Sequence, residues 1–316
     1  MNMKEYTSVN EAIHDICGEE VSIEKTLSVS GGDINDAYAC ILSDGSKIFM
    51  KSNRRENIDF FRKEAEGLSA IKDTSTIKTP DVLGIGTDGN RSYLLLSFIK
   101  SKGKTADFWG NFGRKMAELH SAPADKYVKY AGEEATQKRG LNKDANNGSG
   151  RFGFIHDNYI GAGYQVNEPR EMWIVFFREC RLKPQIERAE RYFDGTAVKK
   201  INRLMEKLDN YLIEPEMPSL LHGDLWSGNY MTGDDGEAWL IDPAAYVGHA
   251  EADIAMTELF GGFHKDFYIA YNEAKPMQPD YEDRKELYNL YHLLNHLNLF
   301  GGGYLYSVQR IIDRYA

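Results

Sequence analysis

The sequence is poor in features that mark secreted or membrane-embedded proteins. Its three cysteines, Cys17, Cys40 and Cys180, are too widely spaced for a disulfide framework or a Cys-x-x-Cys metal pair. No apolar run is long enough to span a bilayer, and the first residues contain no apolar signal segment. We therefore expect a cytoplasmic protein in a reducing compartment, with no membrane partner.

The chain also lacks a block of positive charge. It has 38 Lys and Arg residues against 48 Asp and Glu residues, which gives a net charge of −10. A nucleic-acid or anionic-membrane partner is therefore not expected. Any site for an anionic nucleotide must be local, made of glycine-loop amides, one or two lysines and a metal ion. The apolar fraction of 42% is that of a globular protein with an ample core.

A compact polar motif is present in the second half of the chain. Asp224 follows an apolar run and Asn229 comes five positions later. Residues 232–236 predict a turn, so that the hairpin around it would bring Asp242 back beside Asn229. This order is typical of kinase catalytic loops. We therefore expect Asp224 to accept the proton of an attacking hydroxyl, and Asn229 and Asp242 to bind Mg²⁺.

The first hundred residues follow the order of parts that covers ATP in a kinase. Gly31 and Gly32 lie in a loop between two strands, where glycine lets the backbone approach phosphates. Lys51 ends the third strand and can reach them as a point charge. A helical apolar stripe over residues 58–72 has Glu64 beside it, so we expect Glu64 to pair with Lys51. The expected strands are 21–30, 38–42, 47–51, 82–86 and 93–99.

A change of composition after residue 99 predicts a domain boundary, because the next five residues are polar and include glycine. The expected fold class is α+β, with two lobes as in protein kinases. Residues 1–99 would form a small antiparallel sheet with one helix, and residues 100–316 a larger, mainly helical lobe. In a kinase, backbone groups just before the boundary bind adenine. The expected hinge residues are Ser97, Phe98 and Ile99.

The second lobe is expected to be mainly helical, with a polar loop over residues 130–150. A segment over residues 152–167 mixes aromatic and amide side chains, which suits a carbohydrate-like ligand. Asp253 could cap a helix that runs to residue 260 or support the backbone of the catalytic loop, and the pattern leaves both open. The other expected helices are 107–120, 171–191 with a break near Pro184, 196–212 and 287–300.

Three further patterns have ordinary explanations. Residues 84–89 spell Gly-x-Gly-x-x-Gly, but a strand follows instead of the helix that a dinucleotide site needs, so we expect a hairpin turn. His292 and His296 are four residues apart without a third ligand nearby, and we interpret them as helix and core residues. Ser227 lacks the strand–turn–helix setting of a hydrolase nucleophile.

Several stretches together resemble one family of small-molecule kinases. They are Leu-His-Gly-Asp-Leu-Trp-Ser-Gly-Asn at 221–229, Asp-Pro-Ala at 242–244, Gly-His-Ala-Glu-Ala-Asp at 248–253, and segments at 152–154, 165–167, 257–263 and 290–301. On these residues the chain resembles the fructosamine kinases, or ketosamine-3-kinases, which are related to aminoglycoside and choline kinases. The resemblance covers nearly the whole chain, and Trp226 separates this family from other small-molecule kinases.

The resemblance implies ATP- and Mg²⁺-dependent phosphorylation of the 3-hydroxyl of a ketosamine, either small or protein-bound. The product is unstable and releases the amine, so the implied role is deglycation. Trp226 is the candidate for packing on the sugar, and His222 is a second candidate for substrate contact. Some members use a glycine-loop cysteine for a redox-sensitive dimer, but residues 31–35 contain none. We expect a monomer or weak dimer, and the sugar stays open among ribulose, fructose and erythrulose.

Two alternatives remain beside this interpretation. The protein could be a kinase for another small alcohol, such as an aminoglycoside or amino-alcohol. It could also be a nucleotide-binding scaffold without catalysis. A substrate panel distinguishes the first alternative, and magnesium-dependent ATP turnover excludes the second.

Overall fold

The computed structural model of the chain describes residues 4–29, 34–129 and 150–316. Contacts between Cα atoms divide the chain into two compact units. The first unit consists of residues 1–108 and 230–243, and the second of residues 109–229 and 244–316. The predicted lobes, 1–99 and 100–316, stay a prediction, and by contacts the 230–243 segment belongs with the first unit.

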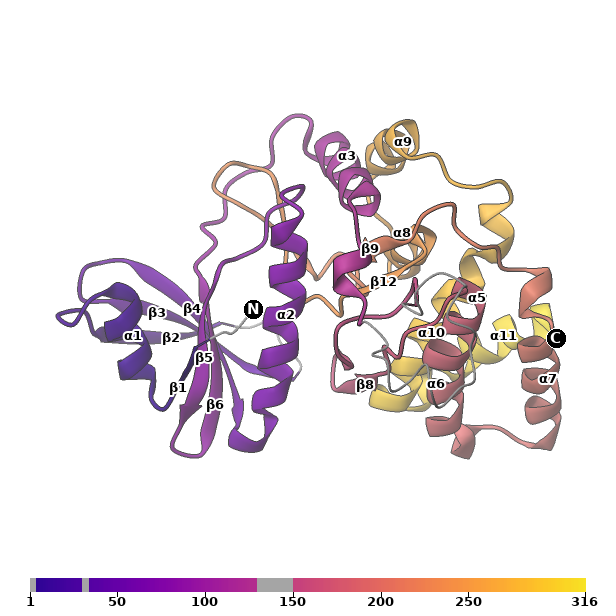
Figure 1. The fold of residues 1–316 in the computed structure, drawn as a ribbon, viewed down its shortest axis with the longest axis horizontal. Coiled ribbons are helices and arrows are strands. Elements are labelled where there is room, and N and C mark those ends of the chain that lie inside the picture. The colour runs from indigo at the N-terminus through magenta and orange to yellow at the C-terminus, as the bar shows by residue number, and fades with distance from the viewer. Residues whose placement is uncertain (1–3, 30–33, 130–149) are drawn as a thin grey trace, which may run out of the picture. The chain divides into compact units, whose positions relative to one another are not determined.

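A six-stranded sheet is the centre of the first unit (Figure 1). Its strand order is β1-β5-β6-β4-β3-β2, in which β1 pairs with β5 in parallel and all other pairs are antiparallel. The elements are β1 (Glu5–Tyr6), α1 (Val9–Cys17), β2 (Ile23–Val29), β3 (Asp36–Leu42), β4 (Lys47–Arg54), η1 (Arg55–Asn57), α2 (Ile58–Asp73), β5 (Val82–Asp88), β6 (Arg91–Ser97), β10 (Tyr230–Thr232) and β11 (Ala238–Leu240).

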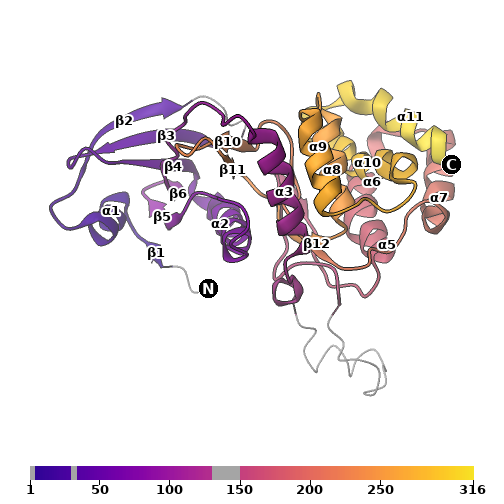
Figure 2. The same ribbon diagram turned by 90° about the horizontal axis from the view of Figure 1, so that it is seen from above.

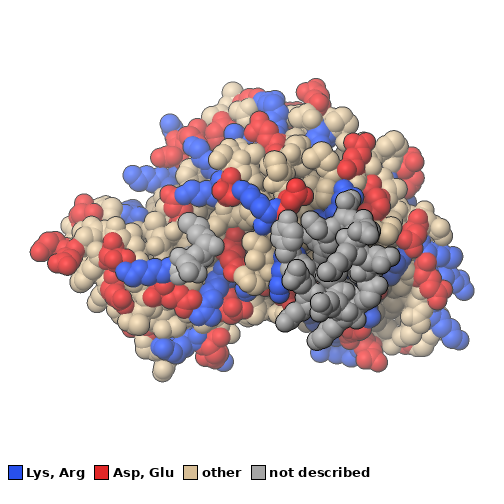
Figure 3. Space-filling model, viewed as in Figure 1, with Lys and Arg blue, Asp and Glu red and all other residues tan. Residues whose placement is uncertain are grey.

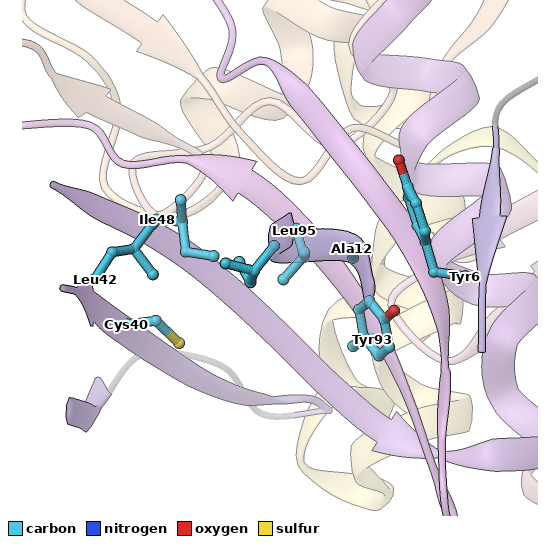
Figure 4. Packing of buried hydrophobic residues seen from close by; sticks show 8 residues of the cluster. Tyr6, Ala12, Cys40, Leu42, Ile48, Tyr93 and Leu95 are labelled. Atoms are coloured by element: carbon cyan, nitrogen blue, oxygen red, sulfur yellow. The ribbon is translucent and has the colours of Figure 1, made fainter. Parts of the chain in front are cut away.

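Strand β6 is buried on both faces, which explains its unbroken apolar run. Leu94 and Leu96 pack in a cluster with residues of α2. Tyr93 and Leu95 point the other way, into a cluster that includes Ala12 of α1 (Figure 4). Because successive side chains of a strand alternate between faces, one helix covers each face of the sheet.

The second unit is mainly helical, and a short ladder between β9 and β12 supports the polar motif. Its long helices α8, α9 and α10 can be followed in Figure 2. The elements are α3 (Phe108–Ser121), η2 (Asp125–Tyr127), β7 (Asn158–Ile160), β8 (Gly163–Gln165), α5 (Trp173–Phe176), η3 (Phe177–Leu182), α6 (Lys183–Arg188), η4 (Glu190–Tyr192), α7 (Gly195–Glu206), η5 (Leu208–Asn210), β9 (Ser219–Leu221), β12 (Tyr246–Gly248), α8 (Ala250–Leu259), α9 (Lys265–Ala274), α10 (Tyr281–Phe300), η6 (Gly302–Tyr304) and α11 (Leu305–Tyr315).

The predicted α+β class is confirmed, but the expected antiparallel sheet with one helix is corrected, because β1 pairs with β5 in parallel and two helices, α1 and α2, cover the sheet. The Gly-x-Gly-x-x-Gly pattern lies in β5 and the turn to antiparallel β6, as expected for a hairpin. The expected helix break near Pro184 is absent. Residues 177–182 instead form a π-helix that leads into α6, and Pro184 lies in the first turn of α6. A wider turn tolerates the missing N–H of proline. The last long helix begins at Tyr281, six residues earlier than expected.

The surface carries both signs of charge, as the composition of the chain predicts. On the face drawn in Figure 3, acidic and basic side chains alternate among the described residues. Within the described ranges, no helix has both the length and the apolar character needed to cross a membrane.

The close approach of α3 and α9 gives a stability test. A Cβ at Gly113 would run into the carbonyl oxygen of Phe267. Overpacking costs about 1–3 kcal/mol, more than the roughly 1 kcal/mol that alanine gains over glycine in a helix. We expect Gly113→Ala to lower the urea midpoint of unfolding. Gly195→Ala in α7, where nothing lies within 4 Å, is the matched control, and an equal effect of both would contradict this packing.

Candidate active site

The polar motif forms a loop that leaves β9 and holds Asp224 through two neighbours. The amide nitrogen of Asn229 donates to the backbone oxygen of Asp224 at 2.8 Å and to its carboxylate Oδ2 at 3.0 Å. The imidazole Nδ1 of His222 accepts the backbone N–H of Asp224 at 3.3 Å. The structure therefore brings together Asp224 and Asn229, and Asp224 itself is only half-buried.

A buried carboxylate fixes the backbone just before Asp224. The two oxygens of Asp253 accept the backbone N–H groups of His222 and Gly223, at 2.7 and 2.8 Å. Helix α8 is capped instead by His249, whose side chain accepts the N–H of Glu251. Of the two roles left open for Asp253, the supporting one is confirmed.

Two more side chains extend this support into the helical unit. The Nε2 of His120 lies 3.1 Å from Asp253 Oδ2, and its Nδ1 lies 2.8 Å from the Tyr271 hydroxyl. Burial would raise the pKa of Asp253, but the hydrogen bond and charge of His120 and the Gly223 N–H outweigh it and lower that pKa. The carboxylate is therefore ionised and fully bonded at neutral pH.

Two residues after Asp242, the backbone of Ala244 packs against the catalytic loop. Gly223 has a φ of +82°, and a Cβ there would collide with the carbonyl oxygen of Ala244. The Ala244 N–H in turn donates to the His222 carbonyl at 2.9 Å. Glycine is required at position 223 because both its backbone conformation and its close neighbour exclude a side chain.

The first unit contains a second polar cluster, around Lys51. Its ammonium bonds Glu64 of α2 at 2.6 Å and also contacts the Asp242 carboxylate. The predicted pairing with Glu64 is confirmed, but Lys51 lies within β4 and not at the end of its strand. Burial would lower the pKa of Lys51, yet the Asp242 and Glu64 carboxylates outweigh it and raise that pKa. The ammonium is therefore charged at neutral pH.

Asp242 follows the predicted hairpin, which β10 and β11 form. Its φ of +56° lies in the left-handed region, which is uncommon for residues other than glycine, although aspartate adopts it more readily than most. One carboxylate oxygen pairs with Lys51, and the side chain is 43% exposed. Since Asn229 uses its amide nitrogen to bond Asp224, its oxygen is the atom suited to a cation. Oxygen atoms of this kind are the ligand type that Mg²⁺ prefers, so each of the two side chains has the chemistry of a Mg²⁺ ligand within its own unit.

Residues were also predicted for the phosphate loop, the adenine hinge and the substrate contact. Gly31 and Gly32 lie outside the described residues. Ser97 ends β6 and exchanges hydrogen bonds with Asp81, and Phe98 and Ile99 follow it half-buried. The side chain of His222 is fully buried and accepts a hydrogen bond from the loop backbone, and its contact with the substrate stays a prediction.

Trp226, by contrast, is 37% exposed. A side chain at Gly228 would overlap its indole ring, so the glycine makes room for the tryptophan.

The predicted carbohydrate-like site at 152–167 is also wrong for its amides. Asn158, Gln165 and Asn167 are at most 2% exposed. Asn158 donates to the Ala245 carbonyl at 2.8 Å and Gln165 to the Ala244 carbonyl at 3.0 Å. These amides hold the segment that follows Asp242 and leave nothing for a sugar at the surface.

Comparisons with known proteins show the family to which the chain belongs. The sequence model of the family described as fructosamine kinase matches residues 5–316. The chain belongs to the fructosamine kinase family. Among other members, a protein named probable ketoamine kinase from Synechocystis is 37% identical over 313 residues, which cover 98% of this chain and 96% of that protein. The chloroplastic protein-ribulosamine 3-kinase of Arabidopsis thaliana is 38% identical over 309 residues, covering 94% and 84%.

Solved structures place this fructosamine kinase family member in the kinase-like fold. A candidate fructosamine-3-kinase from Haemophilus somnus 129PT superposes with a TM-score of 0.80 at 27% identity, covering 98% of this chain and 96% of that one. A type I macrolide 2′-phosphotransferase superposes at 0.55 with 14% identity, covering 98% and 99%, and shares the fold alone.

His120 and Tyr271 were not predicted from the sequence. They lie far from the motif along the chain, and His120 is 133 positions from Asp253. Each is on an otherwise ordinary amphipathic helix, and a buried histidine gives no local signal that separates it from a core residue. Only the Gly-His-Ala-Glu-Ala-Asp stretch pointed toward this support, through Asp253.

Asp253→Asn tests the buried carboxylate. We expect a loss of about 2–3 kcal/mol in the free energy of unfolding at pH 7, since two backbone N–H groups lose a charged acceptor. Because the folded pKa of Asp253 is lowered, its contribution is present above about pH 4 and declines as the pH falls below that. Urea unfolding at several pH values measures both effects. Asp313→Asn, an exposed residue paired with Lys200, should change little, and a pH-independent penalty for Asp253→Asn would contradict this assignment.

Proposed function

We propose that this protein is an ATP-dependent kinase that phosphorylates the 3-hydroxyl of ketosamines and so removes sugar adducts from amines. The observation that carries the proposal is the loop geometry, in which Asn229 and Asp253 fix Asp224 beside an exposed Trp226. Members of the same family are named ketoamine kinases and protein-ribulosamine 3-kinases. Both lines of support point to a sugar hydroxyl as the acceptor.

The chemical step asks for positioning more than for covalent catalysis. The C3 oxygen of the ketosamine attacks the γ-phosphorus of ATP, the bond from that phosphorus to the bridging oxygen breaks, and ADP leaves. Asp224 orients the hydroxyl and accepts its proton late in the transfer. The hydrogen bonds from Asn229 keep the carboxylate in one orientation for this task.

The nucleotide side of the site is assigned to the first unit. Lys51, oriented by Glu64, would contact the phosphates, while Gly31 and Gly32 would cover them. Asn229 and Asp242 are the residues that would hold Mg²⁺, which when bound neutralises charge on the phosphates. The proposed adenine-binding hinge is Ser97, Phe98 and Ile99.

The acceptor side is assigned to Trp226, which would pack on the sugar. The ketosamine 3-phosphate decomposes and releases the amine, so phosphorylation achieves deglycation. Small and protein-bound ribulosamines, fructosamines and erythrulosamines all present the same C3 hydroxyl next to a keto group. We further propose that the protein is cytoplasmic and a monomer or weak dimer.

A turnover panel tests the proposed function. ATP consumption is measured with Mg²⁺ on ribulose-lysine, fructose-lysine, an aminoglycoside and an amino-alcohol. We expect turnover on the ketosamines alone. Turnover only on the antibiotic or the amino-alcohol would replace the substrate class, and ATP binding without turnover on any acceptor would favour a non-catalytic scaffold.

Asp224→Asn tests the proton acceptor. We expect kcat to fall at least about 10²-fold, in the range of lost general-base catalysis, while the Kd for ATP stays within about twofold of wild type. Asp234→Asn, in the exposed hairpin turn, is the matched control and should retain full activity. Retained turnover, or loss of ATP binding, in Asp224→Asn would refute this role.

A further inference from the structure

Aromatic side chains form a continuous row that begins on the catalytic loop. Trp226 meets Phe260 edge to face with ring centroids 6.3 Å apart. Phe260 lies 4.9 Å from His296, which in turn lies 5.4 Å from Phe300 and 5.1 Å from Tyr304. We call these five residues the aromatic row. All belong to the second unit, so their mutual arrangement does not depend on the first.

The row is held by well-ordered elements. Phe260 follows the end of α8, His296 and Phe300 are one turn apart on α10, and Tyr304 ends η6. The Nδ1 of His296 donates to the His292 carbonyl at 2.8 Å, which fixes the ring. Burial lowers the pKa of His296, so the ring is neutral at pH 7 and does not repel a cation.

The row is also accessible at both ends. Trp226 is 37% exposed and Phe300 is 52% exposed. Large aromatic side chains that remain in contact with one another at a surface commonly mark a binding site. Here the exposed rings start two residues from Asp224, which ties them to the acceptor side of the reaction.

We propose that the aromatic row binds the aminoalkyl chain of the ketosamine, which is the lysine side chain that bears the sugar. This inference rests on the proposed function. In a ketosamine the amine is on C1, two carbons from the C3 hydroxyl that reacts. Trp226 is two residues from Asp224 on the same loop, so we assign it as the neighbour of the nitrogen when the hydroxyl lies at Asp224, and the rest of the amine extends away from the sugar along the row.

The chemistry of the aminoalkyl chain matches that of the row. The secondary amine is protonated near neutral pH, and an ammonium group is attracted to the face of an aromatic ring, most strongly of tryptophan. The methylene groups that follow are apolar and gain free energy by covering ring surface. The row thus selects ketosamines of long primary amines over those of short ones.

A series of ribulosamines tests the row, made from methylamine, butylamine, hexylamine and Nα-acetyl-lysine. For the wild-type protein, we expect KM to fall as the chain lengthens. Phe260→Ala and Phe300→Ala should raise KM for the hexylamine and lysine adducts about tenfold, the loss expected from one or two uncovered methylenes. The KM for the methylamine adduct, the KM for ATP and kcat should stay unchanged.

Controls separate this inference from the proposed function. Tyr306→Ala removes an aromatic ring that is 78% exposed on the neighbouring helix α11 and outside the row, and it should change no constant. A wild-type KM independent of chain length, or an equal rise for short and long adducts, would overturn the role of the row while leaving the kinase intact. Absence of turnover on every ribulosamine of the series and on fructose-lysine would overturn both the role of the row and the proposed function.

Discussion

The buried carboxylate of Asp253 is the constraint on which the catalytic loop depends. A buried charge is costly unless it is paired and hydrogen-bonded, so its position is fixed by the groups that bond it. Those groups are the backbone N–H of His222 and Gly223 and the imidazole of His120. The loop backbone that leads to Asp224 is thereby tied to α8 and, through His120, to α3. Removal of this one acceptor would leave several donors unpaired at once.

The predicted site residues belong to two units because the chain crosses between the units twice near them. The chain enters the first unit after residue 229 and leaves it after residue 243. Asn229 and Asp242 therefore flank the two crossing points. The segment after the second crossing is held by the amides of Asn158 and Gln165, which bond the carbonyls of Ala245 and Ala244. These amides, which the sequence suggested as a sugar site, instead fix the backbone that follows Asp242.

Much of the site could be predicted from the sequence because its signals are local. The spacing of Asp224 and Asn229, the turn before Asp242 and the position of Glu64 beside an apolar stripe each lie within a few residues. The support given by His120 and Tyr271 could not be predicted, because it depends on contacts between helices far apart in the chain. The buried amides of residues 158–167 were assigned wrongly for a related reason, since residue type alone does not indicate burial.

The most direct test of the central claim is the position of the transferred phosphate. The product of ATP and ribulose-lysine is analysed by phosphorus–proton NMR before it decomposes. Coupling of the phosphorus to the proton on C3, together with later release of free lysine, is the predicted result. Phosphate on any other carbon would keep the kinase fold and its carboxylates but contradict a deglycation role.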